Sequence, residues 1–137
     1  MQQNRVLQTA CGEGQTKLTV DVKTDYCGNS DNSYEITNAE GVVVFEKARL
    51  TFADGFLHSD TYCLAGCVGY KFTMIDLAQD GFGCGGGYYS LTINDNTANT
   101  YTGGNNGEFA EEVIDLGTVL PCTSLSKSKA GKTLKAL

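Results

Sequence analysis

The chain has 137 residues, a length that corresponds to one domain with a hydrophobic core of its own. Its 16 acidic and 10 basic residues give a formal net charge of −6, and this balance argues against nucleic acid as the main partner. No apolar run is long enough to form a transmembrane helix.

The periodic segments are short and alternate between apolar and polar residues, which is typical of β-strands. Lys17–Lys23 alternates cleanly, and Tyr34–Thr37 and Val42–Glu46 flank a hairpin turn at Asn38–Gly41. Further strands are expected at Phe56–Leu64, Tyr70–Ile75, Tyr88–Asn94, Thr100–Thr102 and Glu108–Leu116. The sequence therefore predicts an all-β protein, an antiparallel β-sandwich or jelly roll of about seven to nine short strands.

The strand pattern divides the chain into three parts. Residues 1–16 form a polar N-terminal extension, 17–122 the sandwich domain and 123–137 a C-terminal tail with four lysines and no acidic residue. The first residues lack the apolar centre of a signal peptide, so for a secreted protein we expect this chain to be the mature form.

Six cysteines, an even number, occur in this small acidic domain. They predict three disulfides and an oxidising compartment, with reduced structural thiols as the alternative. A zinc site is not expected, because the CxxxC pair of Cys63 and Cys67 has no second pair to complement it.

A glycine- and aspartate-rich loop joins two of the expected strands and predicts a calcium site. Asp76 and Asp80 would be direct ligands, and the Phe82 carbonyl and a carboxylate from Asp25 or Glu108 would complete the shell. The alternative is that Asp76 caps its strand and Asp80 belongs to an ordinary turn.

Catalytic residues are hard to find in this chain. His58 is the only histidine, and no nucleophile with a neighbouring base can be named. We therefore expect that the protein is not an enzyme and that His58 is a surface or packing residue.

Several short motifs follow one another between Lys17 and Cys122. They are Thr24-Asp25-Tyr26, Tyr34–Thr37 with Asn38–Gly41, Tyr62-Cys63, Tyr70-x-Phe72-x-x-Ile75-Asp76, Asp80-Gly81-Phe82-Gly83-Cys84, Gly87-Tyr88-Tyr89-x-Leu91 and Gly107-Glu108-Phe109. Their order resembles a family of secreted β-sandwich modules in cell-surface proteins of diatoms, other marine protists and marine bacteria. The resemblance implies a module of cell-surface or extracellular-matrix type, commonly attached to larger adhesive or hydrolytic proteins.

The chain departs from the family pattern in its cysteines. The family has paired cysteines after the aspartate–glycine turn, whereas this chain has Cys84 alone and an additional Cys27 in the first loop. Comparison with the family pattern therefore implies that the cysteines of this chain form different disulfide pairs. The implied pairs are Cys27–Cys84 between two loops, Cys63–Cys67 as a local staple and Cys11–Cys122 between the ends of the domain.

Function is predicted from the opposite charges of the tail and the acidic body. We predict a secreted structural or adhesive module that associates with copies of itself through its termini, as a filament or surface-layer subunit. The candidate assembly residues are Lys127, Lys129, Lys132, Leu134, Lys135 and Leu137. Whether the tail docks on its own body or on a neighbouring copy is open.

The alternative function is a carbohydrate-binding module of a secreted protein, directed at extracellular polysaccharide. Exposed tyrosines would stack on sugar rings in such a module. The candidates are Tyr26, Tyr62, Tyr88, Tyr89 and Tyr101.

Overall fold

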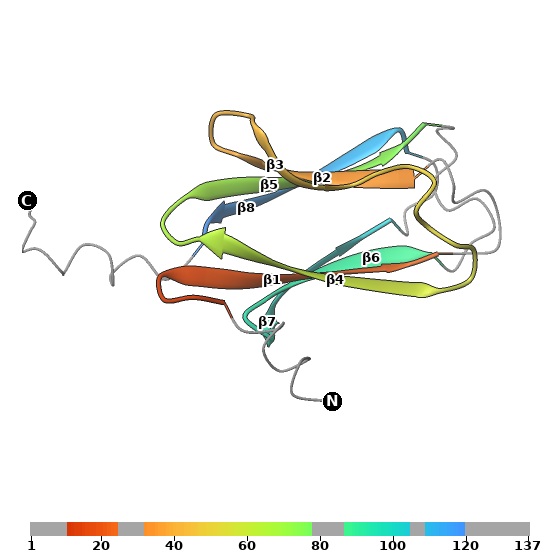
Figure 1. Ribbon diagram of the computed structural model, residues 1–137. Coiled ribbons are helices and arrows are strands. Elements are labelled where there is room, and N and C mark those ends of the chain that lie inside the picture. Colours follow the sequence, from red (N-terminus) through yellow and green to blue (C-terminus); the bar gives the residue numbers. More distant parts are fainter. Residues whose placement is uncertain (1–10, 25–31, 78–86, 105–108, 120–137) are drawn as a thin grey trace, which may run out of the picture.

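Two antiparallel four-stranded sheets pack face to face in the computed structural model (Figure 1). The structure describes residues 11–24, 32–77, 87–104 and 109–119. Its strands are β1 (Gln15–Lys23), β2 (Asn32–Asn38), β3 (Val43–Lys47), β4 (Leu57–Ala65), β5 (Gly69–Asp76), β6 (Tyr88–Ile93), β7 (Asn96–Gly103) and β8 (Glu111–Thr118). The predicted β-sandwich is confirmed.

The sheets have the strand orders β4-β1-β6-β7 and β3-β2-β5-β8. Every neighbouring pair is antiparallel, so the hydrophobic alternation of each strand fixes which side chains enter the core. In β1, for example, Leu18, Val20 and Val22 are buried, while Thr19 and Asp21 point to the outer face. The alternation of apolar and polar residues in the sequence therefore determines the register of the strands within each sheet.

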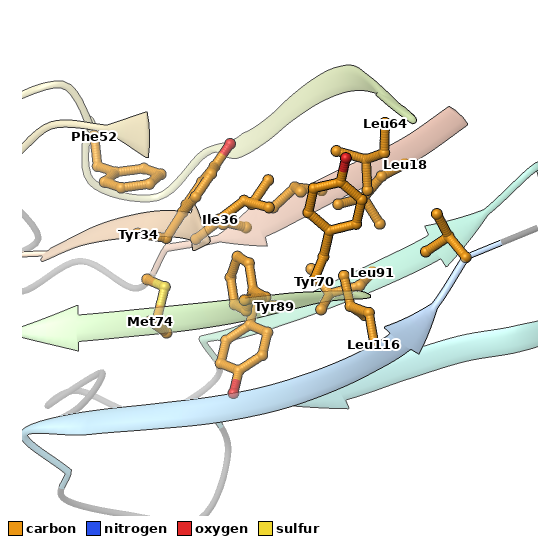
Figure 2. Packing of buried hydrophobic residues seen from close by; sticks show 14 of the residues in the cluster. Leu18, Tyr34, Ile36, Phe52, Leu64, Tyr70, Met74, Tyr89, Leu91 and Leu116 are labelled. Carbon is orange, nitrogen blue, oxygen red and sulfur yellow. The ribbon is translucent and has the colours of Figure 1, made fainter. Parts of the chain in front are cut away.

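The core lies between the sheets and contains a row of aromatic rings (Figure 2). The Phe72 ring of β5 lies at its centre, with a centroid 5.2 Å from that of Tyr34 and 5.2 Å from that of Tyr89. The two tyrosines come from different sheets, Tyr34 from β2 and Tyr89 from β6. The row thus crosses from one sheet to the other.

The Tyr89 hydroxyl forms a hydrogen bond between the two sheets at the side where β7 and β8 lie. It donates a 2.7 Å hydrogen bond to Glu112 Oε1, which also accepts a 2.9 Å bond from the Gly104 amide. Gly103 leaves room for this arrangement, because a Cβ at that position would overlap the Tyr89 ring. Glu112 therefore ties β8 to the opposite sheet.

One buried threonine holds the end of the segment between β3 and β4. Thr24 Oγ1 donates to the Ala53 carbonyl at 2.6 Å and accepts from the Phe56 amide at 3.0 Å, and its own amide donates to the Phe56 carbonyl. Phe52, in the same segment, is buried in the core. The connection is therefore anchored to the end of β1.

Cys11 forms a disulfide with Cys63, and two of the implied pairings are wrong. The turn at residues 12–15 folds the chain back alongside β1, where Lys17 lies opposite Cys63, so Cys11 reaches β4 with a Cα–Cα distance of 5.5 Å. This pair excludes both Cys11–Cys122 and Cys63–Cys67. Cys67 is disulfide-bonded too, but not to Cys63. The Cys27–Cys84 pair lies outside the described residues.

A Gly103→Ala substitution should destabilise the protein by about 1–3 kcal/mol, because the new methyl group must displace the Tyr89 ring. Urea unfolding followed by circular dichroism measures this loss. Gly69→Ala is the matched control, since its Cβ would approach nothing closer than the Gly117 carbonyl at 3.8 Å. Equal stability of the two variants would contradict the packing described for Tyr89.

Candidate functional site

The predicted calcium site falls at one end of the sandwich, where three connections leave the strands. Lys23 pairs with Tyr88, Asn32 with Asp76, and Ile75 with Glu111, so the ends of β1, β5 and β7 and the starts of β2, β6 and β8 meet there. The strands therefore bring together the chain positions that flank the predicted ligands. Asp25, Asp80, Phe82 and Glu108 themselves lie outside the described residues.

Asp76 is the one predicted ligand that the structure describes. It is the last residue of β5 and is only 1% exposed, and its amide donates a 2.8 Å hydrogen bond to the Ala110 carbonyl. A buried carboxylate requires compensating partners, and a cation is one way to supply them. The described residues contain no group of three acidic, histidine or cysteine side chains that could hold a metal. The calcium site and the capping alternative both stay predictions.

A second polar cluster joins the sheets at the side formed by β3 and β4. The hydroxyls of Tyr34 and Tyr62 lie 2.8 Å apart, and Tyr34 also donates to Asp60 Oδ2 at 3.3 Å. Lys47 Nζ forms an ion pair with the same oxygen at 3.2 Å and lies 5.5 Å from the centre of the Phe52 ring. The cluster thus contains two phenols, one carboxylate and one ammonium group.

The buried tyrosines resist ionisation. Burial is the main reason that the pKa values of Tyr34, Tyr62 and Tyr89 lie above the ordinary value for tyrosine, and the charges of Asp60 and Glu112 add to the effect. A phenol that stays protonated serves as a hydrogen-bond donor, not as a base or nucleophile. The hydroxyls of Tyr34, Tyr62 and Tyr89 therefore stabilise the fold.

His58 lies on the strand β4 and packs as the sequence predicted. Its ring meets Phe52 edge-on, with centroids 5.0 Å apart, and its Nε2 lies within hydrogen-bond distance of the Ala53 backbone. That environment holds the imidazole in a packing role. The expectation that the protein is not an enzyme stays a prediction.

The predicted sugar-binding tyrosines separate into two groups. Tyr62 and Tyr89 are engaged inside the sandwich, and Tyr101 packs against the core. Tyr88 differs, because the residue is 40% exposed and lies on the outer face of the β4-β1-β6-β7 sheet. The alternation along β6 indicates the outward orientation of Tyr88, since Tyr89 and Leu91 share the inner face. Tyr26 lies outside the described residues.

The strand β3, which the sequence predicts at Val42–Glu46, has an exposed apolar edge that the alternation pattern does not reveal. It lies at the edge of its sheet and pairs only with β2 among the described residues. Val42, Val43 and Val44 precede or open this strand and are 55%, 43% and 37% exposed. The signal was the run of three valines, which carries no charge to protect a sheet edge.

The six candidate assembly residues of the tail lie outside the described residues. No helix in the described part of the chain is long and apolar enough to span a membrane. In comparisons with known proteins, no family model, curated protein or solved structure matches the chain.

Stability should fall as the pH rises above about 10, the ordinary pKa of tyrosine. The folded state holds the phenolic protons of Tyr34 and Tyr89 more tightly than the unfolded chain does. Their contribution to the free energy of unfolding is therefore complete below that pH and is lost as the pH rises above it. Each of the two tyrosines should lower the free energy of unfolding by up to about 1.4 kcal/mol per pH unit above that value. Urea unfolding across this range measures the slope, and Tyr34→Phe should reduce it. A slope that is absent from the wild-type protein would contradict the burial of these hydroxyls.

If calcium binds, chelation should lower the melting temperature, because a ligand that binds only the folded state stabilises it. Asp80→Ala should abolish the response to chelator, and Asp95→Ala, at an exposed carboxylate of the opposite end, should leave it intact. Differential scanning calorimetry with and without chelator provides the measurement. An unchanged melting temperature of the wild-type protein would rule out the calcium site.

Proposed function

We propose that the protein is an extracellular structural or adhesive module that associates with copies of itself. The observation that carries the proposal is the exposed valine run at the edge strand β3. An edge strand presents unpaired backbone groups, and proteins that stay monomeric protect such edges with charge, proline or bulges. The β3 edge lacks charge and proline at Val42–Val44, and its pairing with β2 shifts register between Val43 and Phe45. The valines still offer an apolar template for a strand of a second copy.

None of the other three edge strands that the structure describes has a run of three exposed apolar residues. The strand β7 is polar along its exposed length, and β8 carries Glu111, Glu112 and Asp115. In β4 the outward positions Ser59 and Thr61 are polar. The valines of β3 therefore favour this edge over the others as the contact between copies.

The proposed contact is small, so a second element is needed for stable assembly. A strand of five residues can form only a few backbone hydrogen bonds with a partner. The basic tail supplies an opposite charge to the acidic body, as the sequence predicts, and we keep Lys127–Leu137 as the second contact of the assembly.

An extracellular location is supported by the disulfides. Cys11, Cys63 and Cys67 are all disulfide-bonded, and the described part of the chain holds no free cysteine. Disulfides of this kind persist in oxidising compartments and are rare in the cytosol. Secretion is thus part of the proposal.

The double substitution Val43→Lys and Val44→Lys should convert the assembly to monomers, because two buried charges would oppose strand pairing. The folded state should tolerate it within about 0.5 kcal/mol, as for other surface changes. Analytical ultracentrifugation gives the particle size. Val113→Lys, on the exposed face of β8 at the other edge of the sheet, is the control and should leave assembly unchanged.

Deletion of residues 124–137 separates the two contacts. The truncated protein should associate more weakly than the full chain while its β3 edge is intact. Wild-type protein that is monomeric at all accessible concentrations would refute the proposal. Loss of assembly on deletion, with full assembly of the double lysine variant, would show that the tail acts without β3.

A further inference from the structure

The outer face of the β4-β1-β6-β7 sheet carries two rows of polar side chains that run across the strands. The register places Thr61, Thr19, Thr92 and Thr100 side by side in one row. The next row consists of Ser59, Asp21, Ser90 and Thr102. We call these eight residues the hydroxyl face, since all but Asp21 bear a hydroxyl group.

The hydroxyl face is open to solvent and regular. The residues of its two outer strands are exposed, those of β1 and β6 are half-buried, and the Thr92 and Thr100 hydroxyls lie 3.4 Å apart. Strand spacing sets neighbours in a row about 4.8 Å apart, and alternate residues of one strand lie about 6.7 Å apart. Each row is therefore about 14 Å long, enough to contact several sugar units.

The other sheet shows that β-propensity alone does not produce this face. Threonine is favoured in strands of any sheet. Yet the central row on the outer face of β3-β2-β5-β8 consists of Glu46, Glu35, Thr73 and Val113, and the next row includes Lys71 opposite Asp115. The central row of this outer face is charged and mixed, whereas the two central rows of the other carry hydroxyls at every position but Asp21.

An aromatic ring borders the hydroxyl face. The row beyond Asp21 contains Leu57, Lys23 and Tyr88, and Tyr88 and Leu57 are 40% and 57% exposed. A tyrosine ring on an exposed sheet face offers an apolar platform with a polar tip. Tyr88 precedes Ser90 on the outer face of β6, so it lies beside the second row and about 13 Å from Thr92 of the first. Its ring can stack on a sugar that the second row holds.

We propose that the hydroxyl face, with Tyr88 as a stacking platform, binds a neutral polysaccharide chain. Serine and threonine hydroxyls both donate and accept hydrogen bonds, as the hydroxyls of a sugar do. The carboxylate of Asp21 is offset by Lys23 two residues along β1, so the face favours neither sign of ligand charge. This inference goes beyond self-association and does not depend on it.

The shape of the face also fits a polymer chain. Adjacent strands of a sheet are rotated by roughly 20–25° relative to one another, so the rows of hydroxyls follow a twisted path. A flexible chain can follow that path, whereas a planar crystal surface cannot contact its whole length. The ligand class is therefore a soluble or loosely packed polymer of uncharged sugars.

Affinity electrophoresis of the full chain tests the proposal, with gels that contain a neutral β-glucan, xylan, mannan or, as the acidic arm, alginate. At least one neutral polymer should retard the wild-type protein. Tyr88→Ala should weaken binding about two- to tenfold, and Thr92→Lys should abolish it. Thr73→Lys is the matched control, because Thr73 is a half-buried threonine on a central strand of the other sheet.

Melting temperatures show whether each variant is folded, and Ser59→Lys at an exposed position replaces Thr92→Lys if the latter unfolds. Val43→Lys with Val44→Lys should bind as the wild type does, whatever its assembly state. Three outcomes would overturn the proposal: no retardation by any neutral polymer, equal loss in Thr73→Lys and the face variants, or binding to alginate alone that Lys23→Ala removes.

Discussion

The need to give every buried phenol a hydrogen-bond partner governs the organisation of this sandwich. Tyr34 and Tyr89 flank Phe72 in the core, and a hydroxyl left unpaired there would cost about 1–3 kcal/mol. Their partners come from edge strands: Asp60 and Tyr62 of β4 on one side, and Glu112 of β8 on the other. A single row of rings therefore locks the open sides of the sandwich as well as its centre. Burial also raises the pKa values of Tyr34 and Tyr89, so both phenols act as hydrogen-bond donors.

Much of the fold could be predicted from the sequence, because hydrophobic alternation is strong in the central strands. Leu18, Val20 and Val22 show it in β1, and the glycine turn at Asn38–Gly41 closes the predicted hairpin with a 2.9 Å bond between the Gly41 amide and the Asn38 carbonyl. The strand β7 was underestimated, since its sequence is almost entirely polar and its exposed residues carry no periodic signal. A two-residue turn, in which Asn94 and Asp95 adopt left-handed φ values of 53° and 58°, starts its hairpin with β6. The register then shifts between Ile93 and Thr92, so Thr92 pairs with Thr100, which no turn signal in the sequence indicates.

Functional features were harder to predict, because they depend on which distant strands become neighbours. The sequence could place Asp76 at a strand end, but the pairing of Cys11 with Cys63 follows from the alignment of β1 with β4. The same holds for the hydroxyl face: Thr61 and Thr100 lie far apart in the chain and meet Thr19 and Thr92 only through the register of four strands. Tyr88 is the exception, since its outward orientation is visible in the alternation of its own strand.

The position of β3 at the sheet edge has a geometric consequence for an assembly. Two identical strands that pair antiparallel are related by a two-fold axis perpendicular to their sheet, so the two four-stranded sheets would merge into one continuous sheet. Both sandwiches would then lie on the same side of it, and both hydroxyl faces would point in the same direction. A polymer that leaves one face could engage the next without turning, and each further contact would form at a high effective concentration. A weak single site would in this way act as a strong multivalent one.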